Sequence, residues 1–174
     1  MDREMKKTLV ILAIIMTSSS VSFAQRAIGL RTGTAVTRMI GTELSYQQPL
    51  NNNRLEIGFG MSGIFEINDN NRNNSFLFSV LATYQWKFDI VNGFKWYVGP
   101  ATSVGLNFVQ IDKKLEGPTL GIGGQIGIEY DFSSKGIPLQ LSLDSRPMIY
   151  LLNTTSFRSV GSTLGIGLSV RYTF

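Results

Sequence analysis

The sequence has neither cysteine nor histidine among its 174 residues. Without cysteine the fold cannot be held by disulfides, even if the protein is exported to an oxidising compartment. Without histidine it lacks the commonest general base and the commonest metal ligand. These two absences predict a protein with no catalytic residues, no cofactor and no metal, although a site built on carboxylates alone is not formally excluded.

Long hydrophobic runs are missing beyond the N-terminal segment. There, two lysines precede a short apolar run at 9–16, and the segment ends on Ser22-Phe23-Ala24. This order is typical of a secretory signal peptide, so we expect residues 1–24 to be removed and residues 25–174 to form one domain. The run is too short for a membrane helix, which needs about 20 apolar residues.

Charge of either sign is sparse, at 16% of the residues. Removal of residues 1–24 leaves 13 basic and 10 acidic side chains. This excess is too small to predict a nucleic-acid partner. Hydrophobic residues make up 43% of the chain, and their even spread favours a sheet with one face in an apolar medium.

What the sequence does have is strict alternation of apolar and polar side chains. At the C-terminus, every second residue from Leu164 to Phe174 is apolar, with small or polar residues between. Such alternation is typical of a β-strand with two unlike faces. Eight stretches of this kind occur, at 26–36, 42–49, 54–65, 75–88, 94–108, 118–132, 138–150 and 160–174.

The connections between these stretches are alternately short and long. Asn92-Gly93 is a strong two-residue hairpin signal, and the alternate connections are mostly longer, polar and mixed in charge. An even number of strands joined in this way is typical of outer-membrane barrels. We therefore predict an all-β fold, an eight-stranded antiparallel transmembrane up-and-down β-barrel. Both termini would lie in the periplasm of a bacterium with an outer membrane.

The large aromatic residues of the apolar face all fall close to a short turn or to the C-terminus. They are Tyr46, Trp86, Phe88, Phe94, Trp96, Tyr130, Phe132, Tyr172 and Phe174. In a barrel they would lie at one level, as a girdle at the periplasmic membrane interface. A soluble, lipocalin-like barrel would instead place this apolar set inside. Because an eight-stranded interior is narrow, the bulky side chains fit better on the lipid side.

With these features the chain resembles the small eight-stranded outer-membrane proteins of the OmpA/OmpX type. The resemblance covers the signal peptide, the eight amphipathic strands and the closing Val170-Arg171-Tyr172-Thr173-Phe174. It implies a single barrel in outer-membrane lipids, without a peptidoglycan-binding domain. It also implies that Phe174, with apolar residues at alternate positions before it, is the signal read by the barrel-assembly machinery.

Charged residues also occur on the inward face of the predicted strands. They are Arg31, Glu43, Glu56, Lys87, Lys95, Glu129, Asp131, Asp144, Arg146 and Arg171. A selectivity ring or ligand site is one interpretation, but so narrow an interior leaves no open channel. We favour a packed lumen whose charges pair with one another, because buried charges need partners. Counting the register of neighbouring strands places Glu56 diagonal to Lys87, and Lys95 close to Asp131, near the periplasmic rim.

Inward Gly-x-Gly pairs, such as that at 165–167, are interpreted as permitting tight curvature.

The densest polar stretch within a strand is Asp144-Ser145-Arg146-Pro147. Asp144 and Arg146 would face the lumen, where pairing is favoured over catalysis because no histidine can act as base. Pro147 cannot donate a hydrogen bond to the strand ladder, so it predicts a bulge or bend.

Small membrane barrels that act as lipid A palmitoyltransferase or deacylase rely on histidine with serine. We therefore expect no enzymatic activity.

Every long loop carries at least one basic residue. These residues are Arg38, Arg72, Lys113, Lys114 and Arg158, and they either contact lipopolysaccharide phosphates or are ordinary solvated charges. The expected function is a structural, surface-interaction or complex-docking protein, with a larger outer-membrane complex as its candidate partner. The alternative is a narrow pore, or a barrel that binds a small ligand or lipid in outer-membrane transport.

Overall fold

The computed structural model describes residues 25–35, 39–65, 74–109, 114–153 and 163–174. It contains eight strands and one 3-10 helix: β1 (Ala27–Ala35), β2 (Met39–Leu50), β3 (Asn53–Phe65), β4 (Asn74–Val91), β5 (Phe94–Val109), β6 (Lys114–Asp131), η1 (Phe132–Lys135), β7 (Leu139–Asn153) and β8 (Thr163–Thr173). None of the described residues belongs to a helix long and apolar enough to cross a membrane. The expected signal peptide, residues 1–24, lies outside the described residues.

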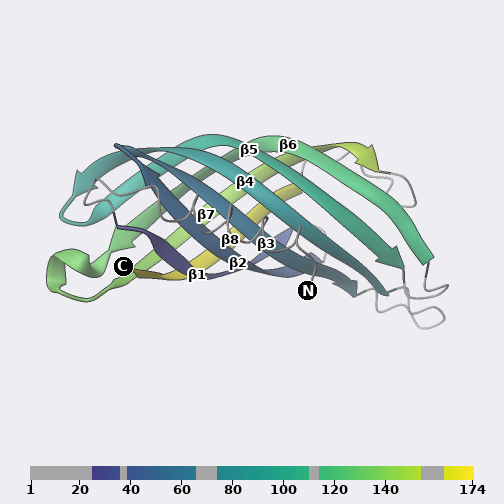
Figure 1. The fold of residues 1–174 in the computed structure, drawn as a ribbon, viewed down its shortest axis with the longest axis horizontal. Coiled ribbons are helices and arrows are strands. Elements are labelled where there is room, and N and C mark those ends of the chain that lie inside the picture. Colours follow the sequence, from purple (N-terminus) through teal and green to yellow (C-terminus); the bar gives the residue numbers. More distant parts are fainter. Residues whose placement is uncertain (1–24, 36–38, 66–73, 110–113, 154–162) are drawn as a thin grey trace, which may run out of the picture.

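Each strand pairs in antiparallel fashion with the next, and β8 returns to pair with β1, which closes the barrel (Figure 1). At the seam Ala27 is the register partner of Thr173. Beyond it, Arg26 and Phe174 exchange two backbone hydrogen bonds, with N···O distances of 3.0 and 2.9 Å. Closure leaves no strand edge to pair with another chain. The predicted eight-stranded antiparallel barrel is thus confirmed.

The short connections form because residues that tolerate positive φ stand at the required positions. Asn51 has φ 55° in the β2–β3 turn, and Asn92 and Gly93 have φ 35° and 88° in the β4–β5 turn. Between β6 and β7 the chain forms η1, which ends at Gly136 with φ 75°. These three connections lie at the same end as the C-terminus (Figure 1). We call this the terminus end and the opposite one the loop end.

The two faces of the sheet differ as the alternation predicts. Outward Leu30 and Phe59 are 57% and 58% exposed, whereas inward Glu56, Gln85 and Arg171 are fully buried. Apolar side chains thus cover the outer wall and polar side chains fill the interior. This is the opposite of a water-soluble barrel and suits a wall surrounded by lipid. The lipocalin-like alternative is therefore excluded.

The prediction of a bulge at Pro147 is wrong. The β6–β7 register is the same on both sides of it, with Ser145 opposite Ile126 and Met148 opposite Gly123. Pro147 faces outward and is exposed, so its missing N–H interrupts the ladder locally without adding a residue. The register shifts instead between Leu120 and Gly121 of β6.

Candidate functional site

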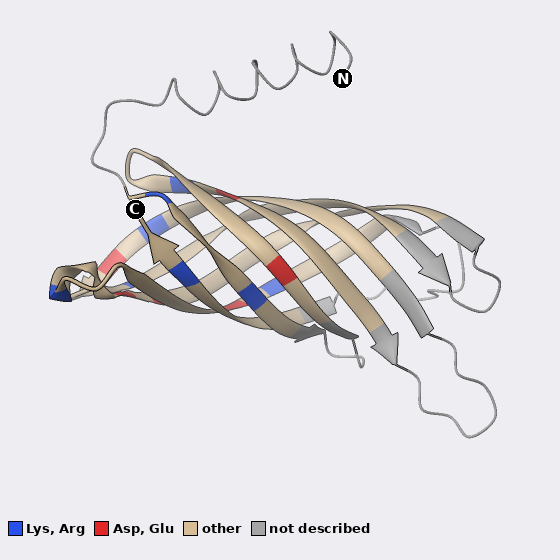
Figure 2. Cartoon of the chain, turned by 60° about the horizontal axis from the view of Figure 1, so that its bottom comes forward, with Lys and Arg blue, Asp and Glu red and all other residues tan. Residues whose placement is uncertain are grey.

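The inward charges of the described strands form an ion-pair cluster across the lumen, in the terminus half and middle of the barrel (Figure 2). We define the lumen ion-pair cluster as four guanidinium groups and four carboxylates: Arg31, Arg54, Arg146, Arg171, Glu43, Glu56, Glu129 and Asp144. Each cation is within 3.1 Å of a carboxylate oxygen. The cluster is therefore electrically balanced, as burial of charge requires.

Glu56 of β3 is the centre of this cluster. Its carboxylate accepts from Arg146 Nη2 at 2.6 Å and from Arg171 Nη2 at 3.1 Å. It also accepts from Gln47 Nε2 at 2.7 Å and from Gln85 Nε2 at 3.0 Å. Two oxygens have room for four donors, so a fully buried carboxylate is satisfied here by residues of four other strands.

A second group of ion pairs joins β1 and β2 to β7. Arg31 Nη2 lies 2.6 Å from Asp144 Oδ1, and Arg146 Nη1 donates to both oxygens of Glu43 at 2.8 Å. Glycine makes room for these side chains. A Cβ at Gly167 would overlap the Arg31 guanidinium group. The prediction that inward glycines permit tight curvature is thus incomplete, because Gly167 also makes space for the Arg31–Asp144 ion pair.

Arg54 of β3 belongs to the cluster, although sequence reasoning omitted it. Its Nη2 lies 2.6 Å from Glu129 Oε2, and its Nε donates to Gln85 Oε1 at 2.6 Å. Its guanidinium group also lies 5.1 Å from the centre of the Tyr97 ring, a cation–π distance. Arg54 is two positions before Glu56 and so shares its face. Strict application of the alternation would have found it.

The prediction that Glu56 is diagonal to Lys87 is wrong, because Glu56 lies opposite Thr83 in the β3–β4 register. The Glu56 carboxylate pairs instead with Arg146 of β7 and Arg171 of β8, which reach it across the lumen. Lys87 lies nearer the β4–β5 turn, opposite Tyr97. Lys95 Nζ is 3.8 Å from Asp89 Oδ1 and 4.0 Å from Asp131 Oδ2. Because Asp89 is 86% exposed, that pair contributes little to stability.

Seven of the nine residues of the predicted aromatic girdle make ring contacts with one another at the terminus end. Phe88 stacks on Trp96, with ring centroids 4.5 Å apart. Tyr130 packs edge to face against Phe94 at 4.5 Å and against Phe132 at 4.6 Å, while Tyr172 and Phe174 stack at 6.3 Å. Tyr46 donates a hydrogen bond to Gln48, and Trp86 meets Tyr84 edge to face. Paired amphipathic rings of this kind suit a membrane interface.

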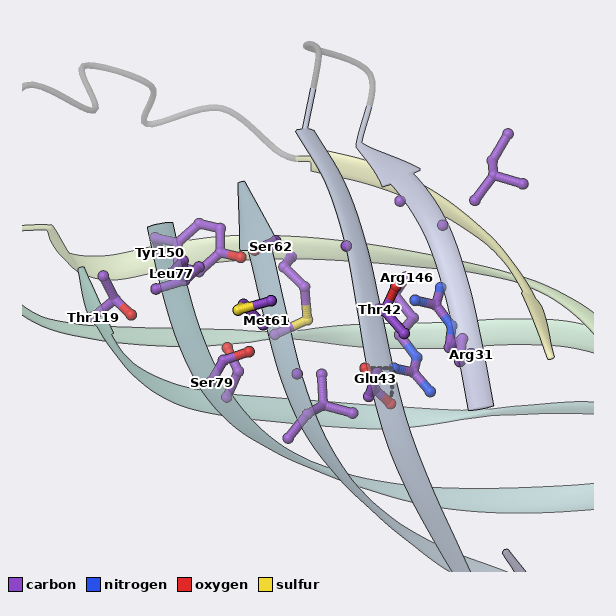
Figure 3. A pocket seen from close by; sticks show the side chains of 18 residues that line it. Arg31, Thr42, Glu43, Met61, Ser62, Leu77, Ser79, Thr119, Arg146 and Tyr150 are labelled. Carbon is purple, nitrogen blue, oxygen red and sulfur yellow. Dashed lines mark hydrogen bonds and ion pairs between the residues drawn. The ribbon is translucent and has the colours of Figure 1, made fainter. Parts of the chain in front are cut away.

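On the loop side of the ion pairs the lumen opens into a cavity of about 150 Å³. Figure 3 shows Arg31, Glu43 and Arg146 at one end of it, with Ser62, Leu77, Ser79, Thr119 and Tyr150 around the rest. The lining thus combines charged, hydroxyl and apolar side chains. We call it the loop-side cavity.

The arrangement offers little to catalysis. Asp144 and Arg146 face the lumen as predicted, but both are held in ion pairs, and Ser145 between them faces the outer wall. Within the described strands and turns, no group of three or more His, Cys, Asp or Glu side chains could hold a metal ion. The basic loop residues are not placed, because Arg38, Arg72, Lys113 and Arg158 and the side chain of Lys114 lie outside the described part of the chain.

The fold is similar to that of two solved outer-membrane proteins. The crystal structure of Neisserial surface protein A (NspA) aligns with a TM-score of 0.61 and 15% identity, over 86% of this chain and 95% of that one. The solution structure of outer membrane protein H (OprH) from P. aeruginosa in DHPC micelles aligns with a TM-score of 0.57 and 16% identity, over 87% of this chain and 100% of that one. No family model and no curated protein matches the sequence. At such low identity the likeness concerns the barrel fold.

Proposed function

We propose that this chain is a non-enzymatic integral outer-membrane barrel that serves as a structural, surface-interaction or complex-docking protein with a filled polar lumen. The observation that carries the proposal is the contrast between its two faces. The outer wall is apolar, while the interior is occupied by mutually paired charges. A wall of this kind suits lipid, and the filled lumen leaves the outer surface and the loops for interaction with other molecules.

Filling of the lumen is supported by the burial of its largest side chains. Arg171, Tyr97, Gln85 and Glu56 are all fully buried. Glu56, Gln85 and Tyr97 come from the neighbouring strands β3, β4 and β5, and Arg171 reaches Glu56 across the interior from β8. An ion crossing this level would have to displace paired groups, which is costly at low dielectric.

The orientation we propose places the terminus end in the periplasm and the loop end outside the cell. Short turns on the periplasmic side and an aromatic girdle at the interface are general features of outer-membrane barrels. In this orientation residues 1–24 serve as the signal peptide, and Phe174 is available to the barrel-assembly machinery. Arg38, Arg72, Lys113, Lys114 and Arg158 then lie on the side of the lipopolysaccharide phosphates.

Fractionation tests this membrane assignment. The protein expressed in a Gram-negative host should sediment with outer membranes, and the refolded protein should change its gel mobility on boiling. Recovery in the periplasmic soluble fraction, without a heat-dependent shift, would refute the proposal.

A narrow pore is the second candidate, and one observation favours it. Among the described residues, five buried side-chain atoms have no hydrogen-bond partner: Thr83 Oγ1, Gln125 Nε2, Arg146 Nε, Ser169 Oγ and Thr173 Oγ1. Buried polar groups of this kind are commonly satisfied by water, and water in the lumen could form a path. Conductance of the purified protein separates a wet but closed lumen from a pore.

A further inference from the structure

The loop-side cavity exists because small residues occupy inward positions on several strands. Gly33, Gly41, Gly60 and Gly165 all line it. At Gly165 an added Cβ would meet nothing nearer than the Arg146 carbonyl oxygen, at 3.7 Å. The space at this position is therefore real, and a larger side chain would fill it. At about 150 Å³ the cavity matches those that hold a molecule about the size of benzene.

The floor of the cavity is formed by three charged residues, Arg31, Glu43 and Arg146. Arg31 and Glu43 are register partners on β1 and β2, and their side chains are 11% and 13% exposed. Their partners on β7, Asp144 and Arg146, are 0% and 4% exposed. A molecule in the cavity therefore meets Arg31 and Glu43, whose charges are opposite, and also the edge of Arg146, which lines the cavity but is held by Glu43 and Glu56. Asp144 is fully buried against Arg31.

The walls of the cavity carry hydroxyl and apolar side chains. Hydroxyl groups come from Ser62, Ser79, Ser103 and Thr119, and apolar surface comes from Leu77, Leu81 and Met148. A solute that lies on the charged floor thus shares the cavity with hydroxyl groups and with apolar side chains. Hydroxyl groups are able to replace part of its lost hydration.

We propose that the loop-side cavity binds a small zwitterion of α-amino-acid type. Its carboxylate lies against Arg31, its ammonium group against Glu43, and its aliphatic side chain toward the apolar part of the lining. The two ion pairs of the floor, Arg31–Asp144 and Arg146–Glu43, together carry no net charge. A single ion therefore gains at one group what it loses at the other, whereas a dipolar molecule gains at both. Entry is from the loop end, because the lumen ion-pair cluster fills the terminus side; to that extent the inference rests on the proposed filled lumen.

Methyl NMR of the full barrel tests the proposal. Met148 lines the cavity and is 4% exposed, so its ¹³C-labelled methyl group reports occupancy in protein refolded in a non-ionic detergent. L-alanine should shift this resonance saturably. Sodium propionate and propylammonium chloride, which each carry one of the two charges, should shift it little. No saturable shift, or equal shifts with the single ions, overturns the inference while leaving the membrane assignment untouched.

Variants that fill the cavity test whether L-alanine binds there. Gly165→Leu should abolish the L-alanine shift. The matched control Gly124→Leu lies on the outer side of β6, with Gly99 O as the nearest atom at 3.4 Å, and should keep it. If Gly165→Leu does not refold, Ser79→Leu fills the same space from β4. L-alanine binding that persists in a folded cavity-filling variant contradicts this location.

Discussion

Arg31 and Glu43 face each other across the β1–β2 ladder, yet each is held by a residue of β7, which lies beyond β8 in the closed barrel. Arg31 pairs with Asp144, and Glu43 pairs with Arg146. The crossed arrangement ties β1 and β2 to β7 and forms the floor of the loop-side cavity.

Removal of the central carboxylate should destabilise the barrel strongly. Glu56→Gln keeps the shape of the side chain but leaves the Arg146 and Arg171 guanidinium groups short of negative charge in a buried site. We expect a loss of about 3 to 5 kcal/mol in the free energy of unfolding, measured by urea titration in lipid vesicles. The control Asp89→Asn removes a pair to an 86% exposed carboxylate and should cost less than about 1 kcal/mol. Equal losses for both variants would argue against a buried cluster.

Space for Arg31 depends on one glycine. In Gly167→Ala the new methyl group would overlap the Arg31 guanidinium group, so the Arg31–Asp144 pair must move. The expected cost is about 1 to 3 kcal/mol of unfolding free energy. Gly165→Ala, two residues away on the same face, meets no atom nearer than 3.7 Å and should be neutral or stabilise by about 0.4 to 1 kcal/mol. A similar response at both positions would mean that Arg31 is not held where the structure places it.

A charged side chain placed on the outer wall should destabilise the barrel. Leu143 is 48% exposed on β7, four residues inside the start of the strand at Leu139, and Leu143→Arg should cost about 2 to 4 kcal/mol in a bilayer. Ile137, 49% exposed between η1 and β7, lies at the terminus end, and Ile137→Arg should cost about 0 to 1 kcal/mol. Folding titrations in lipid vesicles measure both. If Leu143→Arg is as harmless as Ile137→Arg, that face does not meet lipid.

The two tryptophans of the chain, Trp86 and Trp96, should lie at one shallow depth in the membrane. Both stand in the aromatic girdle at the terminus end, and both contact other rings there. Lipids brominated close to the headgroup should therefore quench their fluorescence more than lipids brominated near the chain ends. The variants Trp86→Phe and Trp96→Phe report each residue separately. If lipids brominated near the chain ends quench either tryptophan more strongly, that tryptophan lies inside the hydrocarbon core, which would contradict the girdle.

Much of the barrel could be predicted because alternation depends only on residue order. The eight strands, their outward faces and the inward position of Asp144 and Arg146 follow from parity. The ion-pair partners could not be predicted in the same way. Glu56 meets Arg146 and Arg171 across the lumen, and such contacts depend on barrel closure and strand tilt rather than on the register of neighbouring strands. The prediction that Glu56 is diagonal to Lys87 failed for a different reason, because Glu56 lies opposite Thr83 and Lys87 is four positions further along β4.

The effect of Pro147 and the loop-side cavity could not be predicted from the alternation pattern either. Pro147 suggested a bulge, but an outward proline can interrupt the ladder without changing register. The loop-side cavity arises where glycines of several strands converge, and no single stretch of sequence carries that signal. Arg54 is different, because its shared face with Glu56 was available in the sequence and was overlooked.

Single-channel recording of the purified protein in a planar lipid bilayer tests the central claim most directly. A wall that inserts in lipid around a lumen filled by paired charges predicts a membrane that stays silent over a range of voltages. A porin added to the same bilayer serves as the positive control for detection. Steady and reproducible conductance steps from the purified protein would contradict the filled lumen and favour the pore.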